Sequence, residues 1–188
     1  MREDVPVALP FWVEYCRALY ATPRAWAYKG ENLVHAFEAL ADVVEARSDL
    51  ADLRDQALML AGMAVEVFLK AIAVSDPDTR AIVSGARPRG HGVDAKLWES
   101  FYTHDLTTLA KAATVGLDQS QTVTAAGLSQ YILWKGRYVV PREKGIEHLA
   151  RRDLSPTVEE ARELLEHIIT EVKVRLYGQH VDAATSCN

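Results

Sequence analysis

The chain has 188 residues, of which 49% are hydrophobic and 25% charged, and a formal net charge of −5 at pH 7. This composition is typical of one globular domain with a buried core, and it argues against a generally basic nucleic-acid-binding surface. The two cysteines, Cys16 and Cys187, stand near opposite ends and indicate neither a metal cluster nor a disulfide framework. The acidic first residues lack a secretory signal pattern, which indicates a cytoplasmic protein.

Aromatic side chains concentrate in the first thirty residues, where residues 10–20 are predicted to be helical. Phe11, Tyr15 and Leu19 recur at helical spacing, and Pro23 ends the segment because the residue before a proline is pushed out of the helical region. Such a stripe usually packs against a core, and a platform on which nucleic-acid bases stack is the alternative. We assign residues 1–30 to an N-terminal helical extension.

The next predicted helix covers residues 31–47, and the central helix of the fold covers residues 55–75. The central segment is apolar on nearly every side, as expected of a helix wrapped by other helices. A membrane span is the competing interpretation, but Glu66 and Lys70 interrupt the apolar run. These two stand four residues apart with the acid first, which favours an ion pair on one face. Gly62 predicts a close approach of another helix.

Residues 76–92 are the least regular part of the chain and contain its one locally basic loop. Arg87 and Arg89 stand there among glycines and a proline. A glycine-rich backbone with arginines can bind phosphate, and a solvated loop without a ligand is the other interpretation. No Walker or dinucleotide motif is present, because no predicted strand precedes the loop.

Further helices are predicted after the loop. His104 and Asp105 stand where one of them starts, and we expect this pair to form helix-start hydrogen bonds rather than a catalytic dyad. A later helix closes near Trp134, and the last begins with Ser155 as its cap and ends at Gly178. We predict that residues 179–188 form a flexible tail, and no strand is predicted, so the predicted fold class is all-α.

Metal and nucleophile motifs are absent from the sequence. The histidines are scattered, and neither cysteine has a histidine nearby. We therefore predict no metal and no cofactor. Any catalysis would depend on arginine, histidine and tyrosine.

The order of three segments suggests a family. They are the pattern AVEVFLKAI at residues 64–72, His-Asp-Leu at residues 104–106, and a helix that ends in Arg-Tyr at residues 137–138. Over residues 31–177 this order resembles the HEPN superfamily, helical domains that bind nucleotides. The resemblance implies an up-and-down helical bundle that often dimerises. Many members are metal-independent ribonucleases of toxin–antitoxin, phage-defence or CRISPR systems. Others are catalytically inactive and bind RNA or nucleotides.

The ribonuclease members carry an arginine followed four to six residues later by a histidine. Arg142 and His148 match that spacing. By the resemblance, the arginine would hold the scissile phosphate and the histidine would act as acid or base while the 2′-hydroxyl attacks. Two other pairs also meet the spacing: Arg162 with His167, and Arg175 with His180. Spacing alone therefore does not single out a site.

Arg137 and Tyr138 resemble instead the ending of HEPN branches that lack the ribonuclease motif. In that interpretation Arg137 pairs with a carboxylate, with Glu66 a candidate, and Tyr138 packs with its hydroxyl satisfied. An RNA-binding groove would draw on the cations of the loop and of the later segment. These are Arg80, Arg87, Arg89, Lys135, Arg137, Arg142, Lys144, Arg151 and Arg152.

The sequence thus predicts an all-α, HEPN-like bundle at residues 31–178 that binds RNA or a nucleotide in a bacterial defence or toxin–antitoxin-like system. We expect a homodimer, a partner protein such as an antitoxin or nucleotidyltransferase, and no membrane association. Two alternatives stay open: a metal-independent endoribonuclease that uses Arg142 and His148, and a non-catalytic adaptor that docks another protein. An adaptor would expose a large apolar patch.

Overall fold

The computed structural model describes residues 11–87, 93–135 and 155–178, and within these ranges the chain forms helices and no strands. The chain is an all-α helical bundle with an N-terminal helical extension. The elements in order are α1 (Phe11–Tyr20), α2 (Pro23–Ala46), the 3₁₀ helix η1 (Ser48–Leu53), α3 (Arg54–Ser75), α4 (Pro77–Val83), α5 (Val93–Phe101), α6 (Leu106–Ala112), α7 (Gln119–Gln130), the π-helical turn η2 (Tyr131–Lys135) and α9 (Val158–Tyr177).

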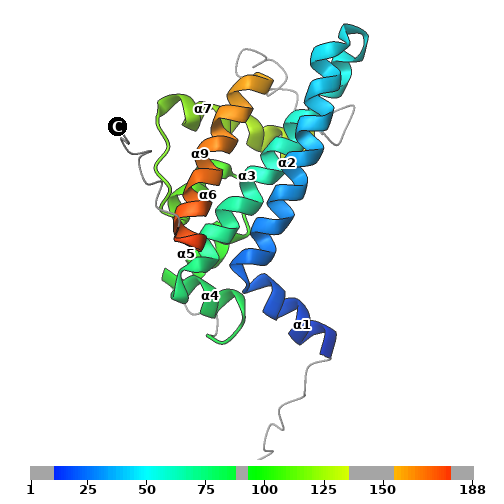
Figure 1. The fold of residues 1–188 in the computed structure, drawn as a ribbon. Coiled ribbons are helices and arrows are strands. Elements are labelled where there is room, and N and C mark those ends of the chain that lie inside the picture. The colour runs from blue at the N-terminus through cyan, green and yellow to red at the C-terminus, as the bar shows by residue number, and fades with distance from the viewer. Residues whose placement is uncertain (1–10, 88–92, 136–154, 179–188) are drawn as a thin grey trace, which may run out of the picture.

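Helix α3 lies at the centre of the bundle. Figure 1 shows α2 running antiparallel to α3 and α9 lying along α3 on the other side. The segment Ser48–Ser75 is long and apolar enough to cross a membrane by length and composition, and 83% of its most apolar stretch is buried inside the bundle. The core helix of a water-soluble protein has the same properties, and α3 packs as such a core helix.

Two glycines allow the central helices to approach closely. A Cβ atom added to Gly62 would lie 2.9 Å from Cγ1 of Ile132, so the close approach that this glycine predicts is confirmed, with η2 as the neighbour. A Cβ atom added to Gly30 would lie 2.6 Å from Cε1 of Phe68. Substituting either glycine would therefore force neighbouring core side chains apart.

Several helix boundaries differ from the sequence prediction. Helix α2 begins at Pro23 and continues through Gly30, because this glycine is required for packing against Phe68 and does not break the helix. Helix α4 forms inside the segment predicted to be irregular, since Asp76 caps it and a proline occupies its first position. Helix α9 is capped by Thr157, not by Ser155, because Thr157 forms a reciprocal capping box with Glu160.

Candidate functional site

Glu66, Lys70 and His104 form a cluster that we call the polar cluster. The Glu66 and Lys70 side chains are only 10% and 8% exposed, and Nζ of Lys70 donates to Oε1 of Glu66 at 2.6 Å. The second carboxylate oxygen of Glu66 lies 2.9 Å from Nδ1 of His104, a residue 38 positions away. Because a carboxylate only accepts hydrogen bonds, Nδ1 carries the proton in this pair. Both oxygens of the buried acid are therefore partnered.

Two aromatic rings enclose the lysine of the polar cluster. Nζ of Lys70 lies 5.7 Å from the ring centroid of Trp26 and 5.6 Å from that of Phe101. The rings themselves meet edge to face at 5.8 Å. The His104 side chain, by contrast, is 46% exposed. The cluster thus neutralises its buried charges internally and presents one fixed imidazole toward solvent.

Asp105 caps the N-terminus of α6. Its Oδ1 accepts from the backbone N–H of Thr107 at 2.9 Å, from the Thr107 hydroxyl at 2.7 Å and from the backbone N–H of Thr108 at 3.1 Å. Burial alone would raise the pKa of Asp105, but these hydrogen bonds outweigh it and hold the pKa below its usual value. Since His104 bonds to Glu66 and Asp105 caps α6, the two neighbours serve different partners.

A second feature is a cleft that we call the arginine–aromatic cleft, between α1, α4 and α5. Its volume is about 270 Å³. Its lining residues are Arg17, Tyr20, Ile82, Val83, Gly85, Arg87, Trp98 and Tyr102. The cleft brings Arg17 and Tyr20 of the N-terminal aromatic segment together with Arg87, which the sequence presents as separate features.

Local contacts position Arg87, Trp98 and Tyr102 at the cleft. Nη1 of Arg87 pairs with Oδ1 of Asp78 at 2.9 Å. Gly85 has φ of +76°, a left-handed conformation that favours glycine, and a Cβ atom there would lie 3.7 Å from the Arg17 guanidinium. The ring centroids of Trp98 and Tyr102 lie 4.2 Å apart. The described residues give Arg17 no carboxylate partner.

Most other described arginines hold the fold together. Arg80 donates to the backbone carbonyls of Val74 and Ser75 at the end of α3. Arg162 forms ion pairs across α2 and α9, and those acids hold the pKa of Arg162 above its usual value. Arg175 donates to the carbonyl oxygens of residues 113 and 114. The structure therefore gives the arginines of both alternative arginine–histidine pairs structural roles.

Several residues predicted from the sequence lie outside the described ranges. These are Arg89, Arg137, Tyr138, Arg142, Lys144, His148, Arg151 and Arg152. Lys135 is the last residue of η2, and its side chain is not described. The ribonuclease pair and the Arg137–Glu66 contact stay predictions.

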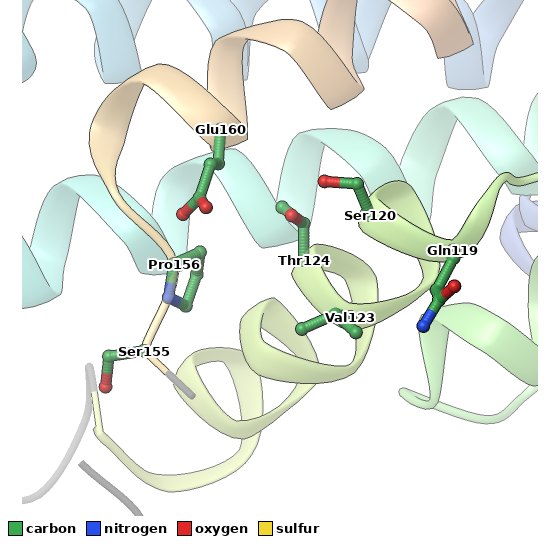
Figure 2. A pocket seen from close by; sticks show the side chains of 7 residues that line it. All are labelled: Gln119, Ser120, Val123, Thr124, Ser155, Pro156 and Glu160. Atoms are coloured by element: carbon green, nitrogen blue, oxygen red, sulfur yellow. The ribbon is translucent and has the colours of Figure 1, made fainter. Parts of the chain in front are cut away.

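A further cleft, of about 480 Å³, lies between the starts of α7 and α9. Figure 2 shows Ser120 and Thr124 on α7 facing the first turn of α9. Carboxylates already lie at both helix starts: Asp118 caps α7 by accepting from the backbone N–H of residue 121, and Glu160 completes the α9 capping box by accepting from the backbone N–H of residue 157. Because these acids repel anions, this polar cleft is not suited to phosphate. The sequence did not predict it.

Within the described residues, no group of three or more histidine, cysteine, aspartate and glutamate side chains could hold a metal ion. Comparison of the chain with models of known protein families, with curated proteins and with solved structures gives no match. The class of this protein is therefore described by its own structure: it is an all-α bundle with a buried polar cluster and an arginine–aromatic cleft.

Proposed function

We propose that this chain is an RNA- or nucleotide-binding protein of the HEPN type, and that the arginine–aromatic cleft contacts the nucleic acid. The observation that carries the proposal is the pairing of Arg17 and Arg87 with three aromatic side chains around one cleft. Guanidinium groups bind phosphate through paired N–H donors. Aromatic rings stack on bases of any sequence, and each stacked base contributes about 1–3 kcal/mol.

The size of the cleft favours one unit of a strand. Its volume of about 270 Å³ is close to the lower limit for pockets that enclose small molecules, which span roughly 300–1,000 Å³. A single base with its phosphate suits such a space better than a whole dinucleotide cofactor. Single-stranded RNA is therefore the class of ligand that the arginines, the aromatic rings and the size of the cleft support best.

The resemblance to the HEPN superfamily supports the same function class. Two segments that carry it, at residues 64–72 and 104–106, contact each other through Glu66 and His104. Under this proposal the protein acts in the cytoplasm of a bacterium, in a defence or toxin–antitoxin-like system. It works there as a homodimer or with an antitoxin or nucleotidyltransferase.

Fluorescence anisotropy of a dye-labelled single-stranded RNA tests the proposal. We expect Arg17→Ala/Arg87→Ala to weaken binding at least tenfold. The double substitution should also flatten the salt dependence, because a plot of log binding constant against log salt concentration loses about 0.7 of slope with each phosphate contact removed. The control is Arg47→Ala/Lys111→Ala, which removes two exposed cations away from the cleft. Equal affinity of the cleft variant and the wild type would sink the proposal, and so would no binding by either protein.

Protein docking is the second candidate function. The specific observation that favours it is the exposed apolar face of α1, which an adaptor would use to bind another chain.

A further inference from the structure

Helix α1 exposes a stripe of large apolar side chains. Phe11, Trp12, Tyr15 and Leu19 are 82%, 66%, 56% and 42% exposed. Phe11, Tyr15 and Leu19 follow one another at spacings of four residues, Trp12 lies next to Phe11 and three residues before Tyr15, and none of the α1 residues is buried. Figure 1 shows α1 extending away from the bundle. Monomeric proteins rarely leave so continuous an apolar surface without a partner.

The other side of α1 is attached to its own chain. Arg17 and Tyr20 line the arginine–aromatic cleft, so this side faces α4 and α5. The elbow between α1 and α2 is fixed because the indole Nε1 of Trp26 donates to the Tyr20 carbonyl at 2.8 Å and the Thr22 hydroxyl donates to a carbonyl of α1 at 2.7 Å. The apolar stripe therefore cannot turn inward without breaking these contacts.

The same molecule carries an apolar groove, which we call the α2–α9 groove. Its volume is about 180 Å³. Its lining residues are Glu31, Val34, His35, Phe68, Ile169, Val172, Lys173 and Tyr177. Phe68 of α3 forms part of the lining between the two outer helices. The groove is an apolar surface of the kind that the α1 stripe requires.

We propose that α1 of one copy docks its apolar stripe into the α2–α9 groove of a second copy, which returns the contact. The lengths agree, since ten residues of α1 span about 15 Å and the groove follows two to three turns of α9. The groove carries one exposed acid, Glu31, and one exposed base, Lys173, and Lys173 offers a counter-charge to exposed Glu14 on α1. A reciprocal contact closes the assembly as a dimer, whereas a one-way contact would continue into a filament.

The area is sufficient for a specific dimer. We call α1 with its apolar stripe the arm. The four apolar side chains of one arm expose on the order of 500 Å² of surface that docking can bury. The side chains of two exchanged arms therefore bury on the order of 1,000 Å² on the arm side alone, which reaches the lower bound for a specific protein–protein interface. This interface uses none of the residues that line the arginine–aromatic cleft, so it forms whether or not the cleft binds a ligand.

Size-exclusion chromatography with light scattering tests the proposal on the full chain. We expect the wild type to have twice the chain mass of 20.9 kDa, and Trp12→Asp/Tyr15→Asp to reduce it to one chain mass. The substituted residues are exposed, so the bundle stays folded. Val123→Asp, at a 48% exposed position on α7, is the matched control and stays dimeric. A monomeric wild type, or an arm variant that remains a dimer, overturns the proposal.

A mixing experiment separates arm-in-groove docking from pairing between two arms. Val34→Glu disrupts the groove and leaves α1 intact, so we expect this variant to be monomeric. In a mixture with Trp12→Asp/Tyr15→Asp, the Val34→Glu chain supplies an intact arm and the other chain supplies an intact groove. A dimer of the two variants should therefore form. Failure of the mixture to dimerise overturns the assignment of the groove. Circular dichroism of each variant checks that its helices are retained.

Discussion

The polar cluster and the arginine–aromatic cleft both combine cations with aromatic rings, yet the two regions differ in what surrounds the charge. In the cluster, Lys70 lies 2.6 Å from an acid, and both partners are nearly buried. In the cleft, Arg17 and its neighbours border open space of about 270 Å³. A cation beside aromatic rings therefore indicates a binding site only where room for a ligand remains. Removing one partner of the cluster should therefore lower stability, and removing a side chain of the cleft should weaken binding.

The largest effect is expected from the polar cluster. Glu66→Ala should lower the free energy of unfolding by about 3–5 kcal/mol, because it leaves Lys70 buried without its counter-charge. Urea denaturation measures this loss. Glu66→Leu/Lys70→Met is the control, since replacing both charges with apolar side chains should restore most of the stability. A loss below about 1 kcal/mol for the single substitution would show that the pair is solvated.

The cleft should respond in the opposite way. Tyr102→Ala should weaken single-stranded RNA binding by about 1–3 kcal/mol, because it removes a stacking surface. The Tyr102 side chain is 43% exposed, so the unfolding free energy should change less than for Glu66→Ala. Anisotropy and urea titrations of the same preparation give both quantities. Loss of stability without loss of affinity would mean that the ring packs the fold and does not touch RNA.

His104 should produce an intermediate change in stability. His104→Ala removes a hydrogen bond to the buried Glu66 carboxylate, and water replaces part of it at this half-exposed position. We expect a loss of about 1–2 kcal/mol in the free energy of unfolding and no change in RNA affinity. A large loss of affinity with unchanged stability would move the binding site from the cleft to this imidazole.

The smallest effect concerns the α6 cap and its pH dependence. Because the folded state lowers the pKa of Asp105, this residue stabilises the fold above its unfolded pKa of about 3.9, and that contribution is lost as pH falls through the lower folded value. Asp105→Asn retains a capping side chain and removes the titration. We expect less than about 1 kcal/mol of change at pH 7 and a shallower loss of stability below pH 4. Identical acid-unfolding curves would contradict this account.

Local patterns predicted the centre of the fold well. The apolar run of α3, the acid–lysine spacing and Gly62 each depend on residues within a few turns of one helix, where helical periodicity alone places side chains. The beginning of α2 was missed because Gly30 looks like a break in the sequence, and only the position of Phe68 shows why a glycine stands there. Packing between helices decided that boundary.

The candidate site could be predicted only in pieces. The aromatic segment and Arg87 were both noted, but the elbow at Thr22, which turns Tyr20 toward α5, is a tertiary feature without a short-range signal. The same limitation applies to His104, whose partner lies 38 residues away. The spacing of arginines and histidines could not show the structural role of Arg162, because Glu38 and Glu45, which pair with it, come from another helix.

Cross-linking of RNA to the unmodified protein tests the central claim most directly. Single-stranded RNA containing 4-thiouridine would be bound, irradiated and digested, and the cross-linked peptides identified by mass spectrometry. The arginine–aromatic cleft predicts cross-links at Tyr20 and at the Trp98–Tyr102 segment, suppressed by excess unlabelled RNA. Cross-links confined to peptides that do not line the cleft, or none at all, would contradict the account.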